Sequence, residues 1–96
     1  MAFVPRYSSE AVQQLESLRA FERVAIMEEI ERVLTVNPTL TSKARVKLLK
    51  QPAPTQYRLR VGDYRVFYDV EPANHVVYVI QILSKEEAIR FLKENP

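Results

Sequence analysis

The sequence of 96 residues contains no cysteine, no tryptophan, one glycine and one histidine. Without cysteine there is neither a disulfide framework nor thiolate chemistry. One glycine cannot form a glycine-rich phosphate loop, and one histidine without cysteine leaves no zinc-ligand spacing. A Ser-His-Asp triad would need His75, which follows a turn predicted at residues 71–74 and is expected at a solvent-exposed strand end. We therefore expect no metal site and no cofactor.

Long apolar runs are also lacking. No run approaches the roughly 20 residues that span a bilayer, and the N-terminus has no signal-peptide pattern. Hydrophobic residues nevertheless make up 47% of the chain, which supports one modest core and argues against disorder. The expectation is a single domain over residues 1–96 of a soluble, cytoplasmic protein with no membrane partner.

Charge is plentiful and unevenly distributed. The net charge is only +2, but residues 43–65 carry seven basic side chains and one acidic side chain. Residues 1–42 carry four basic and six acidic side chains. A basic segment of this density is typical of proteins that bind a polyanion such as nucleic acid. A solvated basic loop would give the same pattern, so charge alone leaves both interpretations open.

The only glycine lies in a Gly62-Asp63 turn that joins two predicted strands. Because a strand alternates its side chains between two faces, Arg58 and Arg60 share the face opposite the apolar one. A two-residue turn would pair Arg60 with Arg65 and Arg58 with Phe67. Like charges directly opposite each other destabilise a sheet. We interpret the cluster as an anion site, for phosphate in the first instance; the alternative is pairing with acidic side chains of the same chain.

The N-terminal third is predicted to contain a short edge strand at residues 2–7 and then helical segments, because apolar residues recur every three or four positions. These segments are either two antiparallel helices or one long kinked helix, and the pattern leaves both open. The second helical stretch, residues 21–36, ends at Asn37-Pro38. Its expected buried stripe is Val24, Ile26, Met27, Ile30, Val33 and Leu34.

Two further strands are predicted beside the hairpin. One is short, around residues 46–49, and the other covers residues 75–83. The latter is apolar on both sides and should be central. Strict alternation assigns Val77 and Val79 to one of its faces and Ile82 to the other.

Ser84 and Glu87 have the spacing of a capping box, which predicts a short C-terminal helix. Helices that precede an antiparallel meander are typical of an α+β fold. The expected architecture is a curved antiparallel sheet of about four strands, with two N-terminal helices packed on one face and the short helix at the C-terminus.

Because the sequence lacks cysteine, a glycine-rich phosphate loop and a metal-ligand pattern, the main catalytic chemistry that remains is stabilisation of negative charge by basic side chains. RNA cleaves itself when a 2′-hydroxyl attacks the adjacent phosphate, which needs in-line geometry, stabilisation of the phosphate charge and proton transfer. Guanidinium groups fork onto phosphate oxygens and stay charged. Arg58, Arg60 and Arg65 suit that task, and Phe67 on the same face is expected to pack against a base or an arginine. No general base is evident, and Lys85 is the candidate for proton transfer.

Residues 57–68, with the sequence Tyr-Arg-Leu-Arg-Val-Gly-Asp-Tyr-Arg-Val-Phe-Tyr, resemble the sheet signature of the RelE/ParE toxin superfamily. Residues 46–49, 77–80 and 85–91 fit the same family in order and spacing. The resemblance implies a small α+β toxin of a type II toxin–antitoxin module. The RelE branch enters the ribosomal A site and cuts messenger RNA, leaving a 2′,3′-cyclic phosphate, whereas the ParE branch poisons DNA gyrase.

The RelE pattern also implies roles for single residues. Arg58 and Arg60 match the two basic residues of the first hairpin strand, and Arg65 matches the arginine that begins the next strand. Lys85 matches the basic residue after the last strand. A tyrosine of the family, which stacks on a base and takes part in proton transfer, falls at Phe91, which can stack but cannot exchange a proton.

The sequence therefore predicts a ribosome-dependent endoribonuclease toxin that acts on messenger RNA and is neutralised by a cognate antitoxin. The alternatives are a gyrase poison or a toxin that only occludes the ribosome, both non-enzymatic on the same fold. The expected catalytic residues are Arg65, Lys85 and Arg60. The expected RNA-binding residues are Arg58, Arg60, Lys47, Lys43, Arg45 and Phe91.

Overall fold

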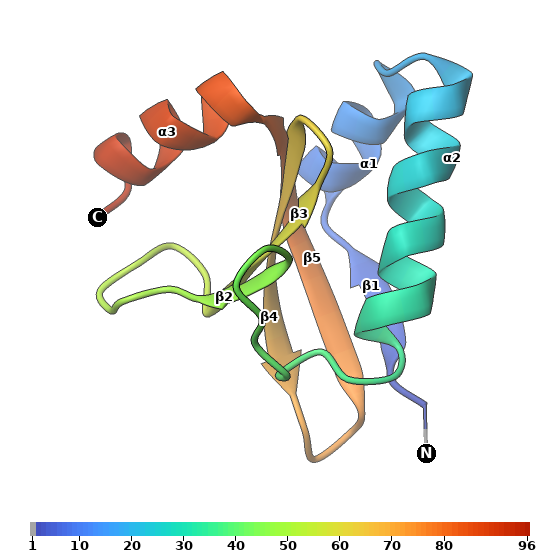
Figure 1. Cartoon of the computed structure of the whole chain (residues 1–96), viewed down its shortest axis with the longest axis vertical. Coiled ribbons are helices and arrows are strands. Elements are labelled where there is room, and N and C mark those ends of the chain that lie inside the picture. The colour runs from blue at the N-terminus through green and yellow to red at the C-terminus, as the bar shows by residue number, and fades with distance from the viewer. Residues whose placement is uncertain (1) are drawn as a thin grey trace.

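The computed structural model describes residues 2–96, which form a five-stranded sheet with helices on both faces. The helices α1 and α2 lie together on one side of the sheet, and α3 lies on the other (Figure 1). This is the predicted α+β fold. In chain order the elements are β1 (Val4–Tyr7), α1 (Ser9–Glu16), α2 (Ala20–Glu29), the π-helical segment η1 (Ile30–Leu34), β2 (Val46–Leu48), β3 (Tyr57–Val61), β4 (Tyr64–Glu71), β5 (Val76–Ser84) and α3 (Lys85–Glu94).

The strand order in the sheet is β1-β5-β4-β3-β2. β2 to β5 form the predicted antiparallel meander, but β1 pairs with β5 in the parallel direction. The expectation of about four antiparallel strands is therefore wrong in number and in direction. The connection from β1 to its parallel partner β5 contains the helices and the strands β2 to β4, so it is long enough for the crossover that a parallel pair needs. Pro5 lies in this edge strand, as predicted, where a missing N–H disrupts no central ladder.

Two separate helices form, and one long kinked helix does not. The Ser8 hydroxyl caps α1 by accepting a hydrogen bond from the Ala11 N–H at 3.0 Å. Arg19 then adopts an extended conformation, with ψ of 150°, before α2 begins at Ala20. Since an extended residue ends the helical hydrogen-bond ladder, α1 and α2 can fold back on one side of the sheet.

The buried stripe of the second helix is narrower than predicted. Ile26, Ile30 and Leu34 are buried, and their spacing of four places them on one helix face. Val24 is 51% exposed and Met27 is 43% exposed, so their assignment to the core is wrong. Val24 lies two positions from Ile26, which at about 100° per residue puts it on the far side of the helix.

A β-bulge changes the faces of β5. Phe67 pairs with Gln81 and Tyr68 pairs with Val79, so Ile80 is an extra residue in β5. An extra residue reverses the alternation beyond it. Ile82 therefore enters the same core as Val77 and Val79, which corrects the prediction of strict alternation.

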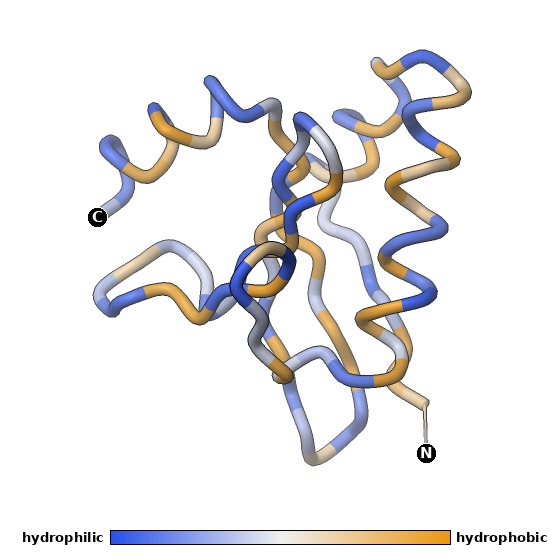
Figure 2. The backbone as a smooth tube through the Cα atoms, in the orientation of Figure 1, coloured by the Kyte–Doolittle hydropathy of each residue, from blue (hydrophilic) through white to orange (hydrophobic). Residues whose placement is uncertain are grey.

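The sheet separates two apolar clusters of different size. The larger lies between the sheet and the helices α1, α2 and η1, and in Figure 2 hydrophobic residues follow the central strands beside these helices. The smaller lies beneath α3 and consists of Leu49, Phe67 and Ala88, with Phe91 and Leu92 packed against it. The N-terminal cap of α3 is the predicted Ser84 capping box. None of the helices formed by residues 2–96 is long and apolar enough to cross a membrane.

Candidate nucleic-acid interface

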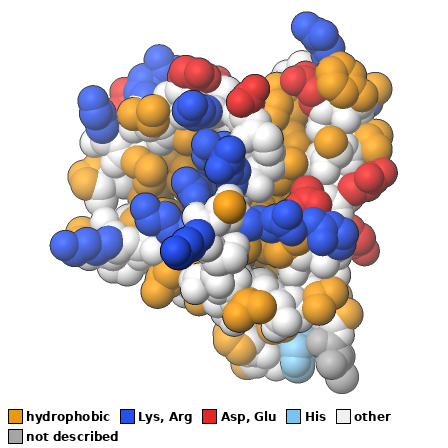
Figure 3. All heavy atoms as spheres, in the orientation of Figure 1, with side chains coloured by type: hydrophobic (Ala, Val, Ile, Leu, Met, Phe, Trp, Pro, Cys, Tyr) orange, Lys and Arg blue, Asp and Glu red, His pale blue; other side chains and the backbone are white. Residues whose placement is uncertain are grey.

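Three arginines share the face of β3 and β4 that points away from the larger core. The pairing of Arg60 with Arg65 and of Arg58 with Phe67 is as the two-residue turn predicted. In Figure 3 lysine and arginine side chains gather between α3 and the loop that follows β2. We call Arg58, Arg60 and Arg65 the arginine face.

Arg58 is the most constrained member of the arginine face. Burial lowers its pKa, and the nearby positive charges of Arg65 and Arg60 lower the same pKa further. Its Nε is buried and has no hydrogen-bond partner among residues 2–96. A buried donor without a partner destabilises the folded state. An anion bound by the other guanidinium nitrogens of Arg58 would offset the repulsion from Arg60 and Arg65.

Within the part of the chain that the structure describes, no carboxylate forms an ion pair with these arginines. Among residues 2–96 the ion pairs within 4.0 Å are Arg32–Glu29 at 2.6 Å and Arg45–Glu29 at 3.7 Å. Asp69, which is near the arginine face, instead accepts a hydrogen bond from the backbone N–H of Gln56 at 2.7 Å. The alternative interpretation was that the three arginines pair with acidic side chains of the same chain. The ion pairs of residues 2–96 do not include such a pair.

Hydrogen bonds to residues 62–64 hold two of the three predicted catalytic residues at the same turn, through the side chain of Arg65 and the backbone of Lys85. The Arg65 Nη1 donates to the carbonyl oxygens of Gly62 and Tyr64, both at 3.0 Å. The backbone N–H of Lys85 donates to the carbonyl oxygen of Asp63 at 2.8 Å. In the sequence only Gly62 indicated the turn, and nothing indicated these contacts. Gly62 adopts a positive φ of 56°, which glycine tolerates.

The basic residues before the hairpin are only partly joined to the arginine face. Lys47 is directly opposite Arg58 in the pairing of β2 with β3, so it extends the positive surface to the sheet edge. Arg45 instead lies within 3.7 Å of Glu29, towards the helices. Lys43 lines an open hollow of about 760 Å³ together with Lys47 and Arg58.

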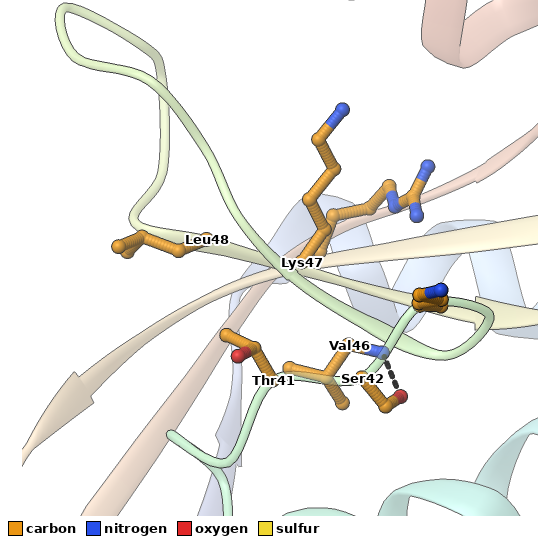
Figure 4. A pocket seen from close by; sticks show the side chains of 7 residues that line it. Thr41, Ser42, Val46, Lys47 and Leu48 are labelled. Atoms are coloured by element: carbon orange, nitrogen blue, oxygen red, sulfur yellow. Dashed lines mark hydrogen bonds between the residues drawn. The ribbon is translucent and has the colours of Figure 1, made fainter.

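That hollow surrounds the edge strand β2 and does not form one convergent anion site. Figure 4 shows Lys47 on one side of β2 and Thr41, Ser42 and Val46 on the other. The Ser42 hydroxyl is engaged, because it accepts a hydrogen bond from the Val46 N–H at 3.2 Å. Lys47 is therefore the member of this group that the fold places beside the arginine face.

The two phenylalanines of this region pack against each other. The rings of Phe67 and Phe91 meet edge to face with centroids 5.1 Å apart. Phe67 is fully buried, so the expectation that it packs against an RNA base is wrong. Phe91 is only partly buried and packs against the smaller cluster.

Comparison with known proteins identifies the fold and the family. Residues 6–89 match the model of the ParE toxin of the type II toxin–antitoxin system parDE. No curated protein sequence is significantly similar to the chain.

Several solved toxin structures have the same fold. The RelBE2 toxin–antitoxin complex of Mycobacterium tuberculosis matches with a TM-score of 0.75 and 19% identity, over 88% of this chain and 99% of that chain. The RelE–RelB complex of Pyrococcus horikoshii matches with a TM-score of 0.72 and 26% identity, over 88% and 97% of the two chains. A free RelE mutant of Escherichia coli matches with a TM-score of 0.71 and 20% identity, over 98% and 97%. The chain belongs to the ParE toxin family of type II toxin–antitoxin systems and has the fold that RelE toxins share.

Proposed function

We propose that this toxin is a ribosome-dependent endoribonuclease that cleaves messenger RNA in the ribosomal A site. The observation that carries the proposal is the arginine face, in which Arg58, Arg60 and Arg65 lie together and no carboxylate of residues 2–96 pairs with them. A cluster of this kind is matched to an anion that carries several acceptor oxygens, and phosphate has the geometry that guanidinium groups bind in a fork.

The proposed reaction is attack of a 2′-hydroxyl oxygen on the adjacent phosphorus, which forms a 2′,3′-cyclic phosphate and breaks the bond to the 5′-oxygen. The 2′-hydroxyl proton passes to water, and the departing 5′-oxygen takes up a proton. Negative charge develops on the phosphate oxygens during this step, and preorganised positive groups stabilise it. Arg58 and Arg60 hold the backbone on either side of the reacting phosphate. Arg65 binds the oxygens that gain charge, and Lys85 assists with charge or proton transfer at the leaving oxygen. Phe91 stacks on a base at the margin of the site.

The test is a translation reaction with purified ribosomes and a defined message, followed by primer extension. We expect cuts within the A-site codon with the wild-type toxin and a loss of about 100-fold with Arg65→Ala, because one lost donor to a developing oxyanion has an effect of this order. Arg32→Ala is the matched control, since Arg32 lies in η1 and pairs with Glu29. Absence of A-site cuts by the wild-type chain would refute the proposal.

A second candidate function is inhibition of DNA gyrase without RNA cleavage, which the match to the ParE family model favours. The two candidates differ in their macromolecular target and are separated by a gyrase supercoiling assay run beside the ribosome assay. Inhibition of supercoiling in the absence of any cut message would favour the second candidate.

A cognate antitoxin is the partner we propose for either activity. The relatives from Mycobacterium tuberculosis and Pyrococcus horikoshii were solved as toxin–antitoxin complexes. A segment with acidic side chains would complement the arginine face and Lys47. Covering these residues would prevent an RNA phosphate from reaching them.

A further inference from the structure

We infer that the Gly62-Asp63 turn is a positioning device whose carbonyl groups fix the Arg65 guanidinium and the start of α3 relative to each other. The expected effect on the rate of RNA cleavage rests on the proposed ribonuclease function. The positions of the Arg65 guanidinium and of the start of α3 do not depend on that function. Gly62 and Asp63 act in this inference only through their backbone carbonyl oxygens, which contact Arg65 and Lys85, and the Asp63 side chain takes no part.

The first half of the device orients Arg65. One guanidinium nitrogen, Nη1, donates to the carbonyl oxygens of Gly62 and Tyr64 at 3.0 Å each. Because the guanidinium group is planar and carries five donors, fixing one nitrogen fixes the direction of the others. The Nε and Nη2 donors remain for an anion, and they have no partner among residues 2–96.

The second half of the device anchors α3. The Asp63 carbonyl accepts the Lys85 N–H at 2.8 Å, at the first residue of the helix. The preceding residue, Ser84, pairs with Tyr64 in the sheet and caps α3 through its hydroxyl. Three consecutive carbonyls, from Gly62 to Tyr64, thus hold an arginine on one side and the start of a helix on the other.

The turn type makes this arrangement testable without loss of the hairpin. Gly62 has φ of +56°, and Asp63 is not among the residues with positive φ, which is the pattern of a type II′ turn. An Asn-Gly pair favours the type I′ turn, which has the same length and the same strand register. The two types differ by about 150° in ψ of the first central residue, so the carbonyl at position 62 points the other way in type I′.

The double variant Gly62→Asn/Asp63→Gly therefore keeps the hairpin and removes an acceptor from Arg65. The matched control is Asp63→Asn, which loses the same charge but keeps Gly62 and the type II′ turn. Single-turnover cleavage on programmed ribosomes is measured at increasing toxin concentration, with thermal unfolding as a check of the fold. Nitrogen-15 NMR of the arginine side chains, assigned with Arg65→Lys, reports rotation of the guanidinium independently of cleavage.

We expect the double variant to lose about tenfold in the single-turnover rate, the effect of one lost hydrogen bond to a charged group. Its half-saturating concentration and unfolding temperature should stay close to wild type, and Asp63→Asn should match wild type in rate. The Arg65 Nη signals should be resolved in the wild type and averaged in the double variant. Unchanged rate in a well-folded double variant, or averaged Arg65 signals in the wild type, would overturn the inference. If the wild type cuts no message, the proposed function fails, and the NMR comparison alone decides the geometry.

Discussion

At the scale of single residues, the arginine face opposes stability. Arg58 is partly buried beside two like charges, and its Nε lacks a partner among residues 2–96. Binding sites commonly retain such unfavourable like-charge clusters, because the charge of a bound anion offsets the repulsion. The effect of substitution therefore distinguishes a binding cluster from a structural one. Removing the charges of a structural cluster lowers the free energy of unfolding of the protein, whereas removing those of a repulsive binding cluster does not.

Replacement of Arg58 by Met should stabilise the protein while it weakens RNA cleavage. The variant keeps an unbranched apolar stem and removes the repulsion from Arg60 and Arg65, for an expected gain of about 0.5 kcal/mol in the free energy of unfolding. Urea unfolding at low salt is the measurement, and the gain should shrink at high salt because salt screens the repulsion. Arg32→Met serves as control and should show no gain, since it removes the exposed Arg32–Glu29 pair. A clear loss of stability in Arg58→Met would show that the fold itself needs this charge.

The ring of Phe91 supplies packing but no transferable proton. Phe91→Tyr should keep the edge-to-face contact with Phe67, because the ring is only partly buried and its margin can accommodate a hydroxyl. A phenol at this position would give the proposed reaction an acid or base, so the cleavage rate on ribosomes should rise by about tenfold or more. Phe91→Leu is the control for packing. A rate equal to wild type in Phe91→Tyr would mean that this position takes no part in proton transfer.

At the scale of elements, α3 depends on its cap and on a small apolar cluster. The Glu87 carboxylate accepts a hydrogen bond from the Ser84 N–H at 2.9 Å, and the Ser84 hydroxyl accepts one from the Glu87 N–H at 3.1 Å. The buried residues of this cluster among residues 2–96 are Ala88 of the helix itself and Leu49 and Phe67 beneath it. The position of Lys85 and Phe91 relative to the arginine face therefore depends on a short, lightly packed helix.

The cap should make the stability of the protein depend on pH through Glu87. Hydrogen bonds from the Ser84 backbone and side chain lower the pKa of Glu87 below its ordinary value of 4.5. A lowered pKa in the folded state contributes stability above pH 4.5 that is lost as the pH falls through the lowered pKa. Wild type should exceed Glu87→Gln by about 0.5 kcal/mol near neutrality, a value typical of a carboxylate at a helix N-terminus, and the difference should vanish in acid.

Urea unfolding of both proteins across that pH range checks the prediction. Glu86→Gln is the matched control, since it removes a charge from the same helical turn and leaves the Ser84 bond intact. A difference between wild type and Glu87→Gln that persists unchanged in acid would contradict the role assigned to the carboxylate.

Elements were predictable where the sequence fixes local geometry. The hairpin register followed from one glycine in a two-residue turn, and the start of α3 followed from the Ser84 capping box. The bulge at Ile80 was not predictable. A strand that is apolar on both faces has no alternation of polar and apolar residues, so an extra residue leaves no mark in the sequence pattern. Exposure of Val24 was missed for a related reason, since an apolar residue on a helix does not by itself reveal which face is covered.

At the scale of the whole molecule, the sheet divides the protein into a half that holds the larger core and a half that carries the arginine face. The helices α1 and α2 cover one face of the sheet, and α3 and the loop after β2 lie on the other side (Figure 1), where lysine and arginine side chains gather between them (Figure 3). Sequence reasoning placed the three arginines on one face from strand alternation together with the two-residue turn, and the observed register agrees. It could not find the parallel pairing of β1 with β5 or the Arg65 contacts to the turn, because both depend on tertiary arrangement.

In cells, expression of the chain alone should arrest growth, and co-expression of its antitoxin should restore it. The arrest should be lost in Arg65→Ala and kept in Arg32→Ala, because only the first removes a charge from the arginine face. Growth curves after induction, with toxin levels compared on blots, provide the measurement. Full arrest by a well-expressed Arg65→Ala variant would show that toxicity does not depend on the arginine face.

The most direct test of the central claim is the chemistry of the cut end of a message exposed to the toxin on programmed ribosomes. Mass spectrometry of the upstream fragment identifies the terminal phosphate. We predict a 2′,3′-cyclic phosphate at a cut within the A-site codon, formed by the wild type and strongly reduced by Arg65→Ala. An uncut message under conditions in which the toxin blocks translation or inhibits gyrase would contradict the claim that the arginine face cleaves RNA.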